Sequence, residues 1–127
     1  MHPIFKALTT IAIATTALTA PAMADPIYMI AQIQIEDHSA FFEEYGAAAG
    51  PQVLGNGGRV LVASPTVDTL EGAWSGNWTV VIEFPSEEAA KQDWYNSDAY
   101  QEAIELRIAS TSLNNIVLAP AFVPPAE

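Results

Sequence analysis

The first candidate for chemistry is a carboxylate inside a strand-like run. Glu83 is the one acidic residue between Trp78 and Phe84. Apolar residues alternate along this run, so Glu83 falls on the face opposite Val80 and Ile82. Burial raises the pKa of such a carboxyl group, a nearby cation lowers it, and the group can serve as a general base. The alternative is a structural role, in which Glu83 forms an ion pair at an interface or is a hydrogen-bonded carboxylate in the interior.

Two arginines are candidate partners for this carboxylate or for a ligand anion. Arg107 shares a helical face with Tyr100 and Ile104, which predicts a packed stem. Its guanidinium is suited to bidentate pairing with Glu83, with another carboxylate or with a ligand anion. Arg59 begins a short strand and has the same interpretation. A structural salt bridge is the alternative for both arginines.

Two uncharged polar residues complete the candidate set. Tyr45 can pack its ring in a core while offering its hydroxyl group to a pocket. Gln32 lies on the less apolar face of the first predicted strand. The candidate ligand-binding residues are therefore Gln32, Tyr45, Arg59, Glu83 and Arg107.

Several other kinds of site are not indicated by the sequence. The chain has no cysteine, and His38 is the only histidine after residue 24, so no metal site is predicted. No nucleophile elbow, phosphate-binding loop or dinucleotide fingerprint occurs. We therefore predict no metal and no cofactor, and we assign no catalytic residue.

The first 24 residues have the features of a secretory signal peptide. Lys6 precedes an uncharged run over residues 7–20, and the segment ends in Ala22-Met23-Ala24. We expect cleavage after Ala24 and an exported protein, periplasmic or secreted. An uncleaved anchor is the alternative, but the run is short for a membrane-spanning helix, which needs about 20 residues.

Removal of this segment leaves a strongly acidic chain of three basic and 15 acidic residues, with a formal charge of −12. Such a charge repels nucleic-acid phosphates and anionic lipid headgroups. Nucleic acid is therefore not an expected partner, and no stable membrane association is expected after cleavage.

Periodicity predicts a sequence of short elements. Strands are expected over residues 27–35, 59–63, 78–84 and 113–119, with residues 69–72 returning to the sheet edge. Asp37 is the predicted cap of a helix over 38–49, and Pro51 is expected not to lie deep inside that helix. Ser86 and Ser97 are the predicted caps of two further helices, the second ending near Ala109. A tail follows at residues 121–127.

This order predicts a ferredoxin-like βαββαβ fold of the α+β class, with one domain over residues 25–120. Right-handed crossovers place the first and third strands at the centre of a four-stranded antiparallel sheet. The helices then cover one face. The other face stays open unless a second subunit covers it, so we expect a homodimer.

The chain resembles the DUF1330 family. The resemblance lies in Tyr28–Ile33 with Asp37, in Gly57-Gly58-Arg59, in Leu70-Glu71-Gly72, in Val80–Ser86, and in Tyr95-Asn96-Ser97 with Tyr100-Gln101 and Leu106-Arg107. It implies a dimeric α/β barrel built from ferredoxin-like subunits. The family's function is unknown, and the broader fold includes small monooxygenases, muconolactone isomerases, haem-degrading enzymes and ligand-binding modules.

Three functional hypotheses follow. The first, which we prefer, is a small-molecule-binding module of the bacterial envelope, with a pocket either between the sheet and the helices or inside the dimer. The second is a cofactor-independent enzyme, such as a monooxygenase or isomerase, that uses Glu83 or a tyrosine for proton transfer. The third is a structural or accessory dimer without a ligand. The first two require a cavity of mixed polarity near Gln32, Tyr45, Glu83 and Arg107, whereas the third requires a filled core there.

Overall fold

The computed structural model describes residues 25–126, so the predicted signal peptide lies outside the described residues. No helix in this range is long and apolar enough to cross a membrane. The elements in chain order are β1 (Ile27–Ile35), η1 (Ala40–Gly46), α1 (Ala47–Gly55), β2 (Arg59–Ser64), β3 (Trp78–Phe84), η2 (Ala89–Tyr95), α2 (Asp98–Ser110) and β4 (Thr111–Pro120), where η marks a π-helical segment.

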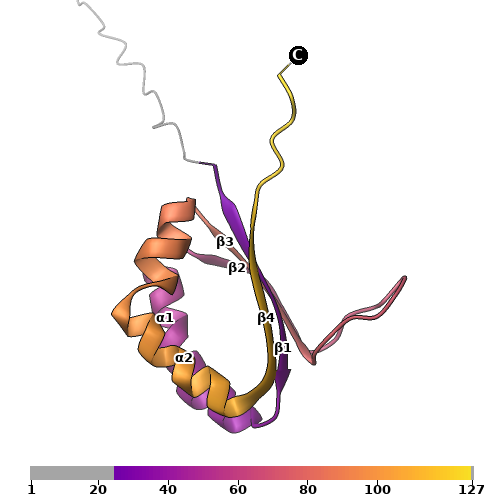
Figure 1. Ribbon diagram of the computed structural model, residues 1–127, viewed down its shortest axis with the longest axis vertical. Coiled ribbons are helices and arrows are strands. Elements are labelled where there is room, and N and C mark those ends of the chain that lie inside the picture. The colour runs from indigo at the N-terminus through magenta and orange to yellow at the C-terminus, as the bar shows by residue number, and fades with distance from the viewer. Residues whose placement is uncertain (1–24, 127) are drawn as a thin grey trace, which may run out of the picture.

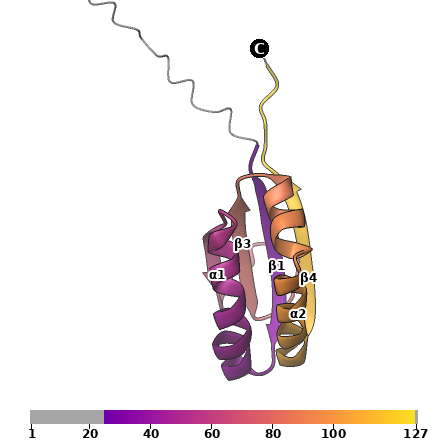
Figure 2. The same ribbon diagram turned by 90° about the vertical axis from the view of Figure 1, so that its left-hand side faces the viewer.

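The four strands form one antiparallel sheet in the order β2-β3-β1-β4. The ferredoxin-like α+β fold and its two central strands, β1 and β3, are as predicted. All the helices lie on one face of the sheet (Figure 1), with α1 on the β3 side and α2 towards β4 (Figure 2). The opposite face carries none of the helices.

The core lies between this sheet and the helices because the strand alternation puts apolar side chains on one face. Met29, Ala31 and Ile33 of β1 are buried, as are Ile82 and Phe84 of β3. In the pairing of β1 with β3, Met29 lies opposite Ile82 and Ala31 opposite Val80, so the two strands present one continuous apolar surface.

The first helical segment is longer than predicted. Asp37 Oδ1 accepts a hydrogen bond from the Ala40 backbone N–H at 3.0 Å, which confirms the cap. The helix ends only at Gly55, and Pro51 lies inside α1, so the expectation for this proline is wrong. Proline leaves the Ala47 carbonyl without its helical donor. Ala47 and Pro51 are both exposed, so this carbonyl remains open to water.

The connection between β2 and β3, residues 65–77, forms an arm that projects from the sheet on the side away from the helices (Figure 1). Residues 69–72 lie in this arm and not at the sheet edge, so that prediction is also wrong. Asn77 fixes the arm's base, because its side chain accepts from the Ile35 N–H at 2.7 Å and donates to the Ile35 carbonyl at 3.0 Å. Trp74 Nε1 donates to Thr79 Oγ1 at 3.0 Å.

Gly76 is required where the arm returns to the sheet. Its φ is +86°, and a Cβ there would lie 2.5 Å from the Ile33 carbonyl oxygen. We predict that Gly76→Ala lowers the free energy of unfolding by about 2–4 kcal/mol, from backbone strain and overpacking together. Denaturant unfolding measures this loss.

Gly72→Ala is the matched control. Gly72 also has a positive φ, of +76°, but nothing lies within 4 Å of its Cβ position. The Gly72→Ala variant should lose only the part of the free energy of unfolding that comes from backbone strain, about 1–2 kcal/mol. Equal losses for the two variants would contradict the close approach of Gly76 to β1.

Candidate functional site

The structure divides the five candidate residues between the two faces of the sheet. Gln32, Arg59 and Glu83 lie on the face without helices, which we call the open face. Tyr45 and Arg107 lie on the helix-covered side. The expectation of one cavity bordered by Gln32, Tyr45, Glu83 and Arg107 is therefore wrong, because the sheet itself separates them.

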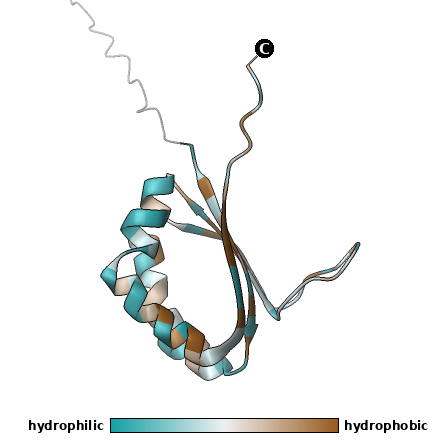
Figure 3. Cartoon of the chain, viewed as in Figure 1, coloured by the Kyte–Doolittle hydropathy of each residue, from teal (hydrophilic) through white to brown (hydrophobic). Residues whose placement is uncertain are grey.

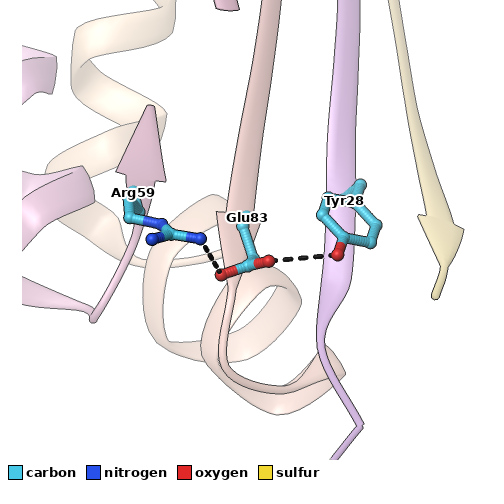
Figure 4. A network of polar contacts seen from close by, with 3 residues as sticks. All are labelled: Tyr28, Arg59 and Glu83. Atoms are coloured by element: carbon cyan, nitrogen blue, oxygen red, sulfur yellow. Dashed lines mark hydrogen bonds and ion pairs between the residues drawn. The ribbon is translucent and has the colours of Figure 1, made fainter. Parts of the chain in front are cut away.

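On the open face, Glu83 joins three neighbouring strands (Figure 4). Its Oε1 accepts from Arg59 Nη2 at 3.2 Å, and its Oε2 accepts from the Tyr28 hydroxyl at 3.0 Å. The hydrogen bond to Glu83 is the main reason why the pKa of Tyr28 is raised. Both carboxylate oxygens thus have partners, so Glu83 acts in the single chain as a cross-strand acceptor.

Gln32 lies on the same face without joining this network. Its side-chain oxygen accepts from Asn115 Nδ2 of β4 at 3.3 Å. The pairing of Arg59 with Glu83 agrees with the ion-pair interpretation of both residues. The Arg59 side chain is 71% exposed and that of Glu83 26%, so the pair contributes little to the stability of the isolated chain.

On the helix side, an apolar cavity of about 280 Å³ lies between the first helical segment and the sheet. Three small residues, Gly46, Ala49 and Gly50, line it from the helix and leave room that larger side chains would fill. The sheet contributes residues from all four strands, including Ala31 and Val80. The aromatic residues that line it are Phe41, Phe42, Tyr45, Trp78, Trp94 and Tyr100.

Two tyrosines supply the hydroxyl groups of this lining. The hydroxyl oxygens of Tyr45 and Tyr100 are 2.6 Å apart. Burial is the largest cause of the raised pKa of each tyrosine, and the Arg107 guanidinium opposes the rise in both. The two groups therefore stay protonated at neutral pH and act as hydrogen-bond donors and acceptors, not as bases.

Arg107 lies behind this hydroxyl pair. It is only 4% exposed, and its Nη1 donates to Asn114 Oδ1 of β4 at 2.7 Å. The guanidinium carbon is 6.0 Å from the centroid of the Tyr45 ring, within the range of a cation–π contact. The proposed partner Glu83 lies on the other face of the sheet, so a pair between these two residues is wrong.

Sequence reasoning missed three residues of this arrangement. Tyr100 was placed on the same helical face as Arg107 but was not assigned to the site, although that shared face was the available signal. Trp94 falls in the helix predicted after Ser86, and its position there does not by itself connect it with the site. Asn114 falls within the fourth predicted strand, where the alternation alone gave no reason to connect it with Arg107.

The raised pKa values predict a loss of stability at high pH. The unfolded chain loses tyrosine protons above the ordinary pKa of 10.0, while folded Tyr45 and Tyr100 keep theirs. The free energy of unfolding therefore falls as the pH rises past 10, by up to about 1.4 kcal/mol per pH unit for each group. Denaturant unfolding at about pH 9 and about pH 11 measures this fall.

Tyr45→Phe removes one of these groups. The variant should lose about 1 kcal/mol at pH 9, because the hydroxyl bond is gone. Its further loss between the two pH values should be smaller than that of the unsubstituted protein. The same or a greater alkaline loss in Tyr45→Phe would contradict the burial of an un-ionised hydroxyl at this position.

Known structures share the fold at low sequence identity. A protein of unknown function from Rhodopseudomonas palustris, RPA0582, is 21% identical with a TM-score of 0.64, covering 79% of this chain and 85% of that chain. SnoaB, a cofactor-independent oxygenase from Streptomyces nogalater, is 14% identical with a TM-score of 0.55, covering 82% of this chain and all of its own. A putative antibiotic biosynthesis monooxygenase from Caulobacter crescentus CB15 is 19% identical with a TM-score of 0.55, and the match covers 80% of this chain and 93% of that chain.

At these identities the similarities establish the fold alone. No curated protein matches the chain. One family model, described as a domain of unknown function (DUF1330), matches residues 26–121, which is nearly all of the chain after the predicted signal peptide. The protein therefore belongs to the DUF1330 family.

Proposed function

We propose that this protein is an exported small-molecule-binding module whose ligand occupies the cavity between the helices and the sheet. The observation that carries the proposal is the cavity itself, about 280 Å³ of space with an apolar, aromatic lining and a tyrosine pair. Sites for small molecules typically combine an apolar wall with a few placed polar groups. A filled core, which the structural-dimer hypothesis requires, does not agree with this space.

The size of the cavity restricts the ligand. Small-molecule sites usually occupy about 300–1,000 Å³, and this cavity, at about 280 Å³, is slightly smaller than that range. A ligand of one or two rings fits such a volume. Phe42 and Trp78 stand edge to face at the lining, with ring centroids 5.1 Å apart, and offer aromatic surfaces to a flat ligand.

A cofactor-independent enzyme is the second candidate function. It is supported by the shared fold with SnoaB, which is described as a cofactor-independent oxygenase. Glu83 lies on the open face, away from the cavity, so proton transfer to a cavity ligand would not use this carboxylate. The tyrosine pair would be the group in contact with a substrate.

The proposal includes a homodimer formed through the open face. The chain is strongly acidic, yet the only charged residues that the strands place on this face are Arg59 and Glu83, which neutralise each other. The helices carry wide hydrophilic stretches instead (Figure 3). The open face comprises Tyr28, Ile30, Gln32, Gln34, Arg59, Val62, Ser64, Thr79, Val81, Glu83, Leu113, Asn115, Val117 and Ala119. Two acidic copies can meet on such a face without strong repulsion.

A substitution at the cavity lining tests the binding function. Gly50 lines the cavity, and nothing lies within 4 Å of its Cβ position, so a larger side chain can be placed at this part of the lining without a clash. We predict that Gly50→Leu weakens binding of prodan, a neutral fluorophore with two fused rings, by about tenfold or more. The fluorescence increase of the probe on titration with the purified protein measures this affinity.

Gly55→Leu is the matched control, because Gly55 is on the same helix, has equally open surroundings and does not line the cavity. It should bind the probe as the unsubstituted protein does, and so should Glu83→Gln on the open face. The proposal fails if the protein does not bind the probe, or if Gly50→Leu and Gly55→Leu bind it equally well.

The dimer is tested by a charge placed on the open face. Val117 is 55% exposed on this face of the single chain. We predict that Val117→Glu weakens self-association by about 100-fold, since it puts like charges into an apolar interface. Light scattering coupled to size-exclusion chromatography measures the molar mass over a dilution series.

Ile108→Glu serves as the comparison, because Ile108 is 59% exposed but lies on α2, on the helix side. It should leave self-association unchanged. A monomeric unsubstituted protein, or equal effects of the two substitutions, would refute the open-face dimer.

A further inference from the structure

The polar part of the cavity lining has more hydrogen-bond donors than acceptors. Tyr45 and Tyr100 carry two hydroxyl protons but share one hydrogen bond, and no other acceptor contacts either hydroxyl within residues 25–126. One hydroxyl proton is therefore free to bind an acceptor atom. The indole N–H of Trp94 also has no partner in this range, but its nitrogen is fully buried, so a ligand in the cavity does not contact it.

A buried cation lies behind these donors. Arg107 forms no ion pair within the described residues, where the salt bridges involve only Arg59 and Lys91. Its Nε is buried and has no hydrogen-bond partner. A buried charge that lacks a counter-charge is costly, and the amide oxygen of Asn114 compensates only in part.

The elements packed around Arg107 supply no negative charge to it. The titratable groups on these elements are Tyr28 on β1, which lies on the open face, Glu36 directly after β1, Glu43, Glu44 and Tyr45 on η1, and Asp98, Tyr100, Glu102 and Glu105 on α2. The carboxylates among them are all exposed, and none lies within ion-pair distance of the guanidinium. The only close polar neighbours of Arg107 are thus uncharged.

We propose that the ligand is a weak acid of one or two rings that binds as its anion, with an ionised oxygen such as that of a phenolate or enolate at the Tyr45–Tyr100 pair. This inference rests on the proposed binding function of the cavity and specifies its ligand class. The free tyrosine hydroxyl donates to the ligand oxygen, and Arg107 stabilises the negative charge from behind the pair. When the neutral acid enters, its proton passes to solvent.

This charge arrangement discriminates against other ligands. A cationic ligand would meet the field of Arg107 and find no carboxylate in the cavity lining. A neutral hydrocarbon would leave the free hydroxyl proton of the tyrosine pair without an acceptor, which weakens its binding relative to the anion. The anion is the form that uses the donors and the buried cation together.

The test measures the ionisation of a bound probe. We use 4-nitrophenol, whose phenolate absorbs visible light, and 4-nitroanisole, a neutral analogue that cannot ionise. The expected result is that the anion binds about tenfold more tightly than the neutral phenol, so the pKa of the bound phenol falls by about one unit. The sign is diagnostic, because non-specific adsorption to so acidic a protein would raise that pKa.

The variants assign this shift to Arg107 and the tyrosine pair. Arg107→Gln should abolish the lowered pKa of bound 4-nitrophenol while leaving 4-nitroanisole bound, and Arg107→Lys should restore part of the shift. The double variant Tyr45→Phe with Tyr100→Phe removes the donor without a change in charge, and it should also reduce the shift. It provides the same comparison if Arg107→Gln does not fold.

The outcomes separate this inference from the proposed function. If both probes bind in competition with prodan but the pKa of 4-nitrophenol is unchanged or raised, the anion preference is wrong and the binding function stands. If the shift survives in Arg107→Gln, the role of Arg107 is wrong. If neither probe binds, the cavity is not a ligand site and both proposals fall.

Discussion

The contact between the hydroxyl groups of Tyr45 and Tyr100 is the interaction on which the rest of the site depends. It joins η1 to α2, and Arg107 beneath it connects both helices to Asn114 of β4. Aromatic rings extend the contact in both directions, to Phe41 at 5.2 Å from Tyr45 and to Trp94 at 4.3 Å from Tyr100, measured between centroids. These large rings hold the helices away from the sheet, while small residues of the first helix leave the space between them empty.

The sheet divides the polar chemistry of the molecule into two parts with different consequences. On the open face, Glu83, Arg59 and Tyr28 satisfy one another, so the face is nearly neutral and suits contact with a second copy. On the helix side, Arg107 has no carboxylate partner among the described residues, and the hydroxyl pair has a proton to donate. Polar groups that are satisfied favour an interface, whereas unsatisfied buried donors favour a ligand.

The sequence was sufficient to predict the fold but not the site. Period-two alternation in β1 and β3 predicted which face of each strand is buried, and it placed Glu83 on the face turned away from the helices. The helix caps predicted at Asp37, Ser86 and Ser97 agree with the observed hydrogen bonds. The prediction that the candidate residues share one cavity failed. Alternation indicates on which face of the sheet a strand residue lies, but it does not indicate which helix packs against that face. The cavity depends on the differing sizes of facing side chains, and such tertiary packing has no signature in local periodicity. Pro51 was misjudged because its tolerance depends on the exposure of Ala47.

The proposed function requires that a small molecule occupies the space between the helices and the sheet. Nuclear Overhauser effects between bound 4-nitroanisole and the side chains of the isotope-labelled protein test it most directly, because they locate the ligand without a substitution. Contacts with Ala31, Tyr45 and Ala49, which line the cavity from the sheet and the first helix, are the expected result. Contacts confined to Ile30, Val81 and Val117 would place the ligand on the open face and contradict the account.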